Sequence, residues 1–205
     1  ELTLQVLLSY PELSVEDALR RMVIITSSMQ KDSMQALKEG NSALAEEVIK
    51  MDDEVDRFSF YIVRQIKTAV QNTRIMKEIG LYSPRECLGY RLIVKSVERA
   101  ADHAVKIAEN VISLDEATSN SVFQKISEMS SFARSVFDNA IKSLFKKDYM
   151  LADSVVMKAK TIASIENEAM KTIVRKIEAI EMSSIRLIME SIRRTAEYAS
   201  DIAEI

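Results

Sequence analysis

Residues that interrupt helices are almost absent from this chain, whose 205 residues include only three Gly and two Pro. In a helix interior, Gly and Pro cost about 1 and about 3 kcal/mol relative to Ala, so their scarcity permits long helices. From Ser14 almost to the C-terminus, apolar residues recur at the three- and four-residue spacing of amphipathic helices. Helices of this length bury their apolar faces by packing side by side. The sequence therefore predicts an all-α protein built from helical bundles.

The few breaking and capping residues divide this pattern into six long helices. Gly40 and Gly80 interrupt it, and Ser83 followed by Pro84 is typical of a helix start. Around residues 115–120 the apolar spacing is lost, which marks a boundary between two halves. The expected helices cover residues 14–38, 42–78, 84–113, 118–146, 149–178 and 182–204.

An internal repeat indicates that the two halves are equivalent. Residues 93–110 (IVKSVERAADHAVKIAEN) and 188–205 (IMESIRRTAEYASDIAEI) are identical at eight of 18 aligned positions. The identities include Arg and Glu as well as apolar residues, which chance similarity between amphipathic helices seldom preserves. The chain is therefore interpreted as two copies of one supersecondary unit.

The repeat leads to a prediction of two tandem three-helix bundles. The first unit is expected over residues 14–114 and the second over 115–205. Residues 1–13 are expected to form an extended lead-in. Because Glu1 is not an initiator methionine, we expect the native protein to extend further, and the lead-in to be the tail of an upstream domain.

Charge and composition exclude several classes of function. The net charge of −3 argues against non-specific nucleic-acid binding, which relies on many Lys and Arg. No window approaches 18 apolar residues, so we expect no membrane insertion, and no signal-peptide pattern begins the chain. The single cysteine, Cys87, excludes an internal disulfide and suits a reducing compartment. We therefore expect a cytoplasmic location.

Two pairs of carboxylates are the strongest candidates for a site. Glu98 and Asp102 are neighbours one turn apart on the helix expected over 84–113, and Asp52 and Asp56 form a similar pair on the helix before it. Like charges at this spacing mildly destabilise a helix. A cation held by oxygen ligands would compensate. A solvated acidic face is the alternative, and the spacing alone favours it.

The second unit departs from this acidic pattern. Arg193 and Glu197 occupy the places of Glu98 and Asp102, and a loose alignment puts Lys160 and Ser164 near the other pair. Because positive side chains repel a cation, any metal is expected in the first unit only.

The two acidic pairs form one site only if they lie level across the turn between their helices. Residues 71–86 decide this, because the first unit has about 13 more residues here than the second. If they form an excursion beyond a hairpin, the pairs meet. If they lengthen both helices, the pairs miss by roughly 12 Å at 1.5 Å per residue.

The remaining reactive residue types do not form a catalytic pattern. A ferritin-like site needs Glu-x-x-His, but position 100 is alanine, so His103 is expected to be a partly buried packing residue. Arg193 and Arg194 are expected to be surface charges. Cys87 has no nearby partner that would mark a nucleophile, and phosphate-loop and zinc spacings are lacking. We therefore expect a protein that is not an enzyme.

The acidic motifs resemble those of the PhoU family of phosphate-signalling regulators. Residues 97–111 (VERAADHAVKIAENV) are similar to the family signature, an acidic-x-x-x-Asp helix followed by an alanine-rich stripe. Residues 48–58 (VIKMDDEVDRF) resemble its other acidic helix. Tandem three-helix units are also typical of the family, and the resemblance covers nearly the whole chain from Ser14.

This resemblance implies a cytoplasmic regulator of phosphate transport and phosphate-responsive signalling. Its implied partners are a phosphate ABC transporter, a membrane sensor kinase or another regulator, and a second copy of the chain. It also implies a metal cluster (Fe, Zn, Mg, Mn or Ca) in the first unit. The candidate metal ligands carried over from the family are Asp52, Asp56, Glu98 and Asp102.

Two other functions stay open from the sequence. Some archaeal relatives carry an AbrB-like DNA-binding domain before the PhoU region, so this segment is alternatively the sensory and dimerisation module of a transcription regulator. We expect no direct nucleic-acid binding by this segment itself. The other alternative is a metal-binding helical protein that uses the acidic motifs for storage or chemistry.

Overall fold

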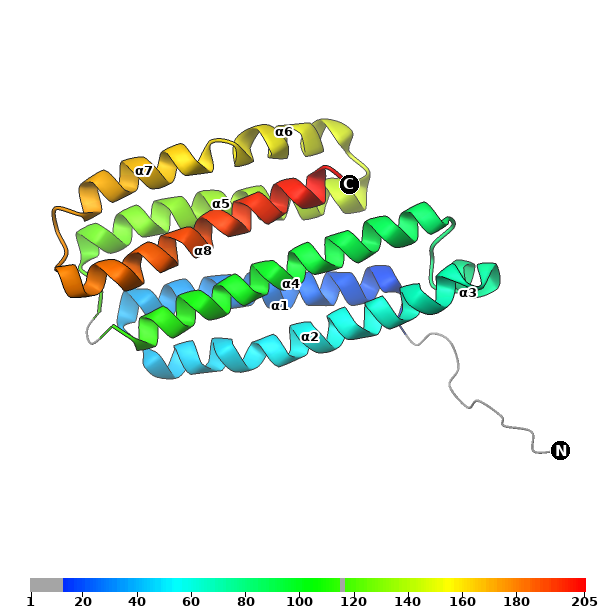
Figure 1. Cartoon of the computed structure of the whole chain (residues 1–205), viewed down its shortest axis with the longest axis horizontal. Helices are drawn as coiled ribbons and strands as arrows, with labels where there is room; N and C mark the ends of the chain where they lie inside the picture. Colours follow the sequence, from blue (N-terminus) through cyan, green and yellow to red (C-terminus); the bar gives the residue numbers. More distant parts are fainter. Residues whose placement is uncertain (1–12, 115–116) are drawn as a thin grey trace.

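The computed structural model describes residues 13–114 and 117–205, and these residues fold as helical bundles (Figure 1). The all-α fold class is as predicted. The lead-in predicted over residues 1–13 lies, apart from Leu13, outside the described residues, as do residues 115–116 beside the predicted unit boundary. The helices are α1 (Val15–Glu39), α2 (Ser42–Val70), α3 (Thr73–Glu78), α4 (Pro84–Ile112), α5 (Asn120–Lys146), α6 (Tyr149–Ala159), α7 (Ile162–Ile173) and α8 (Ala179–Ala203).

The first bundle consists of α1, α2 and α4, which pack against one another in pairs. Ser14, Asn41 and Ser83 cap these helices, and their side-chain oxygens accept backbone N–H groups at 3.0, 3.0 and 3.2 Å. Each cap satisfies one of the free donors at a helix start. Pro84 follows at the first position of α4, where its missing N–H is not needed.

The connection between α2 and α4 is an excursion rather than an extension of both helices. The helix expected over 42–78 ends at Val70, and Asn72 caps the separate short helix α3. Gly80, at φ 84°, turns the chain back towards α4. The excursion is anchored by buried apolar side chains, namely Met76, Ile79 and Leu81.

The second bundle consists of α5, α6, α7 and α8. The helix expected over 149–178 is interrupted after α6, because both the hydroxyl and the backbone N–H of Thr161 bond to the carbonyl of Lys158, at 2.8 and 2.9 Å. This tight turn replaces the regular helical bonding pattern. α6 and α7 together cover the face that α2 covers in the first bundle (Figure 1).

The two bundles are joined along a seam in which α4 packs against α8 and α1 against α5. α4 and α8 run in opposite directions (Figure 1). His103 and Tyr198 are equivalent in the repeat and meet at this seam, with ring centroids 5.7 Å apart. Close approach is provided by buried alanines on both helices, namely Ala100, Ala101, Ala104, Ala196 and Ala199. None of the described helices is long and apolar enough to span a membrane.

Candidate functional site

The excursion brings the two acidic pairs to the same level of the first bundle. Residue 54, midway between Asp52 and Asp56, lies 16 positions before the end of α2 at Val70. Residue 100, midway between Glu98 and Asp102, lies 16 positions after the start of α4 at residue 84. The pair on α2 therefore lies level with the pair on α4, which is one of the two arrangements that the sequence left open.

Contacts between α2 and α4 confirm this alignment. The Ser59 hydroxyl donates a hydrogen bond to Oε2 of Glu98 at 2.7 Å across the two helices. Lys95, one turn before Glu98 on α4, forms an ion pair with the other oxygen of the same carboxylate. Neither residue was singled out from the sequence, although the i,i+3 spacing of Lys95 and Glu98 is a signal for such a pair. We call Asp52, Asp56, Glu98 and Asp102 the carboxylate cluster.

Burial and mutual repulsion change the acidity of the carboxylate cluster. Burial, followed by the negative charges of Asp102, Asp56 and Glu98, raises the pKa of Asp52 from 3.8 to about 6. The pKa values of Asp56 and Asp102 are also raised, first by burial and then by Glu98, while Lys95 works in the opposite direction. Lys95, joined at Asp102 by Lys106, therefore offsets only part of the repulsion among the carboxylates.

One oxygen of the cluster lacks any compensating partner. Oδ1 of Asp52 is buried and accepts no hydrogen bond from the described residues. A buried carboxylate oxygen in this state is costly unless a donor or a cation satisfies it. Four carboxylates are the ligand type that hard cations such as Mg²⁺, Ca²⁺ and Mn²⁺ prefer. The residues therefore fit a cation in chemical type.

The cluster is not preorganised as a metal site. Among the described residues, no group of three or more His, Cys, Asp or Glu side chains is arranged to hold a metal ion. Part of the reason is visible in the contacts, since both oxygens of Glu98 are engaged by Ser59 and Lys95. A cation at Glu98 would share these oxygens with Ser59 and Lys95.

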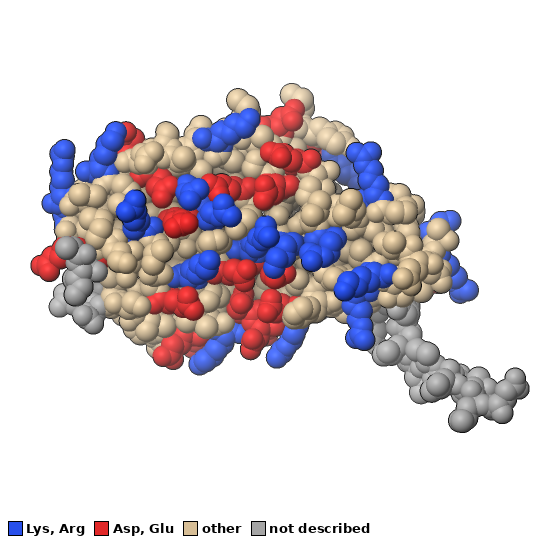
Figure 2. Space-filling model, viewed as in Figure 1, with Lys and Arg blue, Asp and Glu red and all other residues tan. Residues whose placement is uncertain are grey.

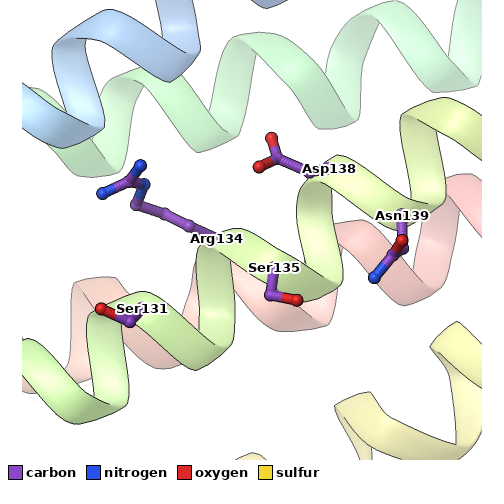
Figure 3. A pocket seen from close by; sticks show the side chains of 5 residues that line it. All are labelled: Ser131, Arg134, Ser135, Asp138 and Asn139. Carbon is purple, nitrogen blue, oxygen red and sulfur yellow. The ribbon is translucent and has the colours of Figure 1, made fainter.

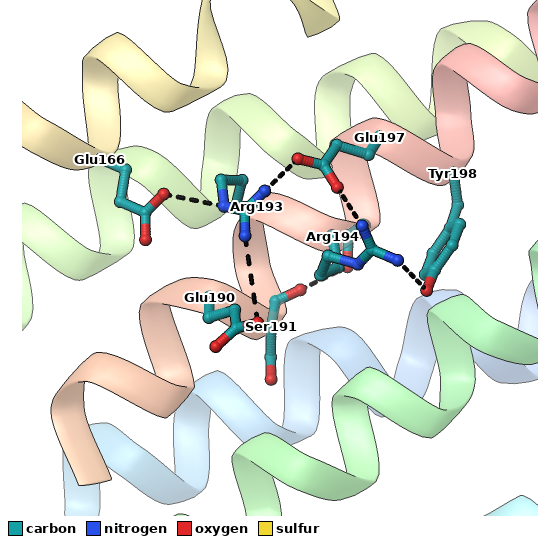
Figure 4. A network of polar contacts seen from close by, with 8 residues as sticks. Glu166, Glu190, Ser191, Arg193, Arg194, Glu197 and Tyr198 are labelled. Atoms are coloured by element: carbon teal, nitrogen blue, oxygen red, sulfur yellow. Dashed lines mark hydrogen bonds and ion pairs between the residues drawn. The ribbon is translucent and has the colours of Figure 1, made fainter. Parts of the chain in front are cut away.

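The corresponding place in the second bundle holds an arginine (Figure 4). Nε of Arg193 lies 2.9 Å from Oε2 of Glu166 on α7, so the contact joins two helices as Ser59 and Glu98 do in the first bundle. Arg193 also forms an ion pair with Glu197, and its Nη2 atom lies 4.0 Å from Glu190. This guanidinium contacts three carboxylates, whereas Lys95 in the first bundle forms an ion pair with Glu98 alone.

The second bundle corrects two expectations. Glu166 faces Arg193, a residue that the loose alignment with Lys160 and Ser164 missed, and Lys160 instead lies exposed at the end of α6. Arg193 is a mostly covered member of an ion-pair network rather than a surface charge, with 27% of its side chain exposed.

The seam beside this network contains the only histidine of the chain. His103 is buried against Tyr198, as expected for a packing residue. Burial, then the positive charges of Lys106 and Arg194, lowers the pKa of His103 to about 4. Arg194 donates a hydrogen bond to the Tyr198 hydroxyl at 3.0 Å and pairs with Glu197 at 2.6 Å. The imidazole is therefore neutral near pH 7.

A shallow hollow on α5 does not combine its polar residues into a binding site. Ser131, Arg134, Ser135, Asp138 and Asn139 line it (Figure 3). All five come from one helix, Arg134 and Asp138 project to the same side, and Asn139 projects to the other. The carboxylate beside the guanidinium disfavours an anion, so the carboxylate cluster remains the stronger candidate.

One protein-family model matches both bundles of the chain. A family model described as "PhoU domain" matches residues 19–111 and residues 126–205. A "phosphate-specific transport system accessory protein PhoU homolog" from Aquifex aeolicus is 29% identical over 158 residues, which cover 75% of this chain and 67% of the relative. A relative of the same name from Pseudomonas aeruginosa is 23% identical over 204 residues, or 93% of this chain and 81% of the relative.

Solved structures show the same fold. The crystal structure of PhoU from Pseudomonas aeruginosa superimposes with a TM-score of 0.80 at 23% identity, covering 93% of this chain and 92% of that one. The crystal structure of the phosphate transport system regulatory protein PhoU from Streptococcus pneumoniae gives a TM-score of 0.79 at 17% identity, with coverages of 93% and 90%.

Proposed function

The chain belongs to the PhoU family, and we propose that it acts as a cytoplasmic accessory regulator of phosphate transport. The observation that carries the proposal is the match of both bundles to the family domain, over residues 19–111 and 126–205. The names of the two relatives, which describe accessory proteins of a phosphate-specific transport system, support the same role.

The proposed mode of action is protein–protein contact rather than catalysis. The proposed partners are the phosphate ABC transporter, a sensor kinase or another regulator, and a second copy of the chain. Exposed charged faces on α2, α4 and α8 (Figure 2) support binding, because charge complementarity steers association and selects partners. The side chains of the carboxylate cluster are half-buried on two packed helices. Sites for small substrates are typically enclosed and mostly apolar pockets.

A cation in the first bundle is part of the proposal. Asp52 and Asp56 from α2 would hold it together with Glu98 and Asp102 from α4. The bound cation would supply positive charge, and the four carboxylates would then tie the two helices together. The buried, unsatisfied Oδ1 of Asp52 supports this assignment. In the second bundle, Arg193 already neutralises the equivalent place, so the proposed site belongs to the first bundle alone.

Deleting the gene in its native host tests the proposed role. Deletion is expected to alter phosphate uptake and the expression of phosphate-starvation genes, and the wild-type gene should restore both. Complementation with Asp52→Asn/Glu98→Gln is expected to restore them incompletely, whereas Asp53→Asn/Glu54→Gln, on exposed neighbours, should restore them fully. Unchanged uptake and expression in the deletion strain would refute the regulatory role.

A further inference from the structure

The end of the first bundle that carries α3 is strongly basic, although the whole chain has a net charge of −3. Residues 64–91 contain six Lys and Arg and only two Glu. All six basic side chains are exposed, and we call this surface the basic end: Arg64, Lys67, Arg74, Lys77, Arg85 and Arg91. Figure 2 shows Lys and Arg standing among uncharged residues at this end, whereas Asp and Glu gather over the middle of the molecule.

Large apolar side chains are exposed among these charges. Tyr82 is 75% exposed and Leu88 is 62% exposed, and Leu88 lies one turn from both Arg85 and Arg91 on α4. Val70 at the end of α2 is also exposed. Single exposed apolar residues are normal, but these three lie at the same end of the bundle as the six basic side chains.

The position of Tyr82 is enforced by the local structure. The Tyr82 backbone N–H donates a hydrogen bond to Oε2 of Glu86 at 2.7 Å, while the Glu86 N–H donates to the hydroxyl of Ser83 at 3.2 Å. This arrangement is a variant of the capping box at the start of α4. Leu81, immediately before Tyr82, is buried. The chain therefore anchors Leu81 in the core and directs the next side chain outwards.

The excursion that carries these residues is specific to the first unit. Thirteen residues separate α2 from α4, whereas five separate α7 from α8 at the corresponding turn of the second unit. α3 lies beyond the ends of the long helices and forms a projecting end of the bundle (Figure 1). A projecting surface fits against a flat partner more readily than around an extended peptide, which needs a groove.

A hollow between the end of α2 and α4 combines apolar and basic side chains. Its volume is about 290 Å³, and its wall contains Val63, Ile66 and Val70. Lys67 and Arg91 also line it, from α2 and α4 respectively. Apolar walls next to two cations suit a lipid phosphate together with the first carbons of its acyl chains.

We propose that the basic end docks on the surface of a membrane that contains anionic lipids. Basic residues near such a surface are attracted by its negative potential. Tyr82 would lie at the level of the lipid headgroups, where aromatic side chains with a polar tip are favoured. The contact is peripheral and involves side chains from the end of α2, from the excursion and from the first turns of α4. The alternative partner for this surface is an acidic segment of another protein. Binding to vesicles and binding to an acidic peptide distinguish the two partners.

Co-sedimentation with vesicles tests the electrostatic part. The full chain is expected to bind phosphatidylcholine vesicles containing phosphatidylglycerol, to release them at high salt, and to ignore pure phosphatidylcholine. Arg85→Glu/Arg91→Glu should weaken binding by at least about tenfold. Arg175→Glu/Lys176→Glu makes the same change of net charge in the exposed turn between α7 and α8, at the opposite end of the molecule, and should bind like the wild type.

Tryptophan fluorescence tests whether the projecting end itself makes the contact, because the chain contains no tryptophan. The emission of Tyr82→Trp should shift to shorter wavelength with anionic vesicles, whereas that of Val174→Trp, which replaces an exposed residue after α7, should not. Absence of vesicle binding, equal loss in both charge variants, or a shift at position 174 alone would overturn the proposal. So would binding of a polyglutamate peptide, but not of vesicles, through Arg85 and Arg91. Phosphate regulation in cells is a separate measurement, so either proposal can fail alone.

Discussion

Glu98 on α4 and Arg193 on α8 occupy equivalent positions in the two bundles and carry opposite charges. Each contacts the neighbouring helix of its own bundle, Glu98 through Ser59 at 2.7 Å and Arg193 through Glu166 at 2.9 Å. The equivalent residues one turn earlier, Lys95 and Glu190, also carry opposite charges. Lys95 forms an ion pair with Glu98, and Glu190 lies near Arg193. The first bundle therefore accumulates negative charge where the second supplies its own cation.

The first prediction concerns metal content. Protein purified without chelator is expected to contain a divalent or trivalent cation, and Glu98→Gln/Asp102→Asn should lose it, because amides are weaker ligands than carboxylates. Asp53→Asn/Glu54→Gln removes the same number of charges from exposed positions on α2 and should keep it. Elemental analysis of the three proteins checks this, and equal metal in all three would place the ion elsewhere.

The pH dependence of stability follows from Asp52, whose pKa is raised from 3.8 to about 6 in the folded chain. Between these values the folded state binds the proton more tightly, so the free energy of unfolding falls as the pH rises from about 4 to about 6. Above about pH 6, the folded state bears the full free-energy cost of keeping Asp52 ionised. We expect Asp52→Asn to remove about 1 kcal/mol of it after allowance for solvent screening.

Urea unfolding in the presence of a chelator measures this effect. Asp52→Asn should be more stable than the wild type at neutral pH, and the difference should shrink towards pH 4. Asp153→Asn, at an exposed position on α6 in the second bundle, serves as the control and should follow the wild type. If the free energies of unfolding of the wild type and Asp52→Asn change in parallel over this pH range, the pKa of Asp52 is not raised in the folded state.

The ion-pair network of the second bundle should contribute measurably to its stability. Arg193→Ala removes the cation shared by Glu166, Glu190 and Glu197, of which only Glu197 keeps a second partner, Arg194. Removal of one partner from a fully buried pair costs about 3–5 kcal/mol, but this side chain is 27% exposed, so we expect about 2 kcal/mol. Lys171→Ala breaks an exposed pair with Glu168 and should change the free energy of unfolding by less than about 0.5 kcal/mol. Similar values for the two variants in urea unfolding would contradict the network's role.

Two glycines should respond to alanine with opposite signs. Gly40 ends α1 at φ 61°, and a Cβ atom there would lie 3.0 Å from the backbone nitrogen of Ala117, so Gly40→Ala is expected to destabilise by at least about 1 kcal/mol. Gly89 lies inside α4, where a Cβ atom would meet only the Cγ2 methyl group of Ile205, at 3.1 Å. Gly89→Ala should therefore be neutral or stabilise by up to about 1 kcal/mol. Thermal unfolding of both variants is sufficient, and a loss of stability in Gly89→Ala would show that Ile205 cannot move aside.

Local signals in the sequence predicted most of the helical framework. Ser14, Asn41 and Ser83 cap helices because side-chain oxygens satisfy nearby backbone donors, which is a property of a few adjacent residues. The break at Thr161 escaped prediction because the apolar spacing continues through it. A single hydroxyl bonded to the carbonyl of Lys158 is too weak a signal to find in a sequence.

The candidate site was predicted in part. Asp52, Asp56, Glu98 and Asp102 stood out because like charges recur one turn apart. Ser59 and Glu166 did not, because each acts across two helices and nothing in the local sequence shows which residue it will face. The metal itself stays a prediction.

By itself, the sequence determined the helical nature of the chain, its duplication and the position of the acidic pairs along the helices. These properties depend on neighbours three or four residues apart, and the helical repeat relates such residues in a fixed way. Only the tertiary structure decided that the pairs lie level, since that depends on how residues 71–83 fold back. Tertiary packing likewise placed Glu166 against Arg193 and turned Tyr82 outwards, because distances between helices are set by packing and not by sequence spacing.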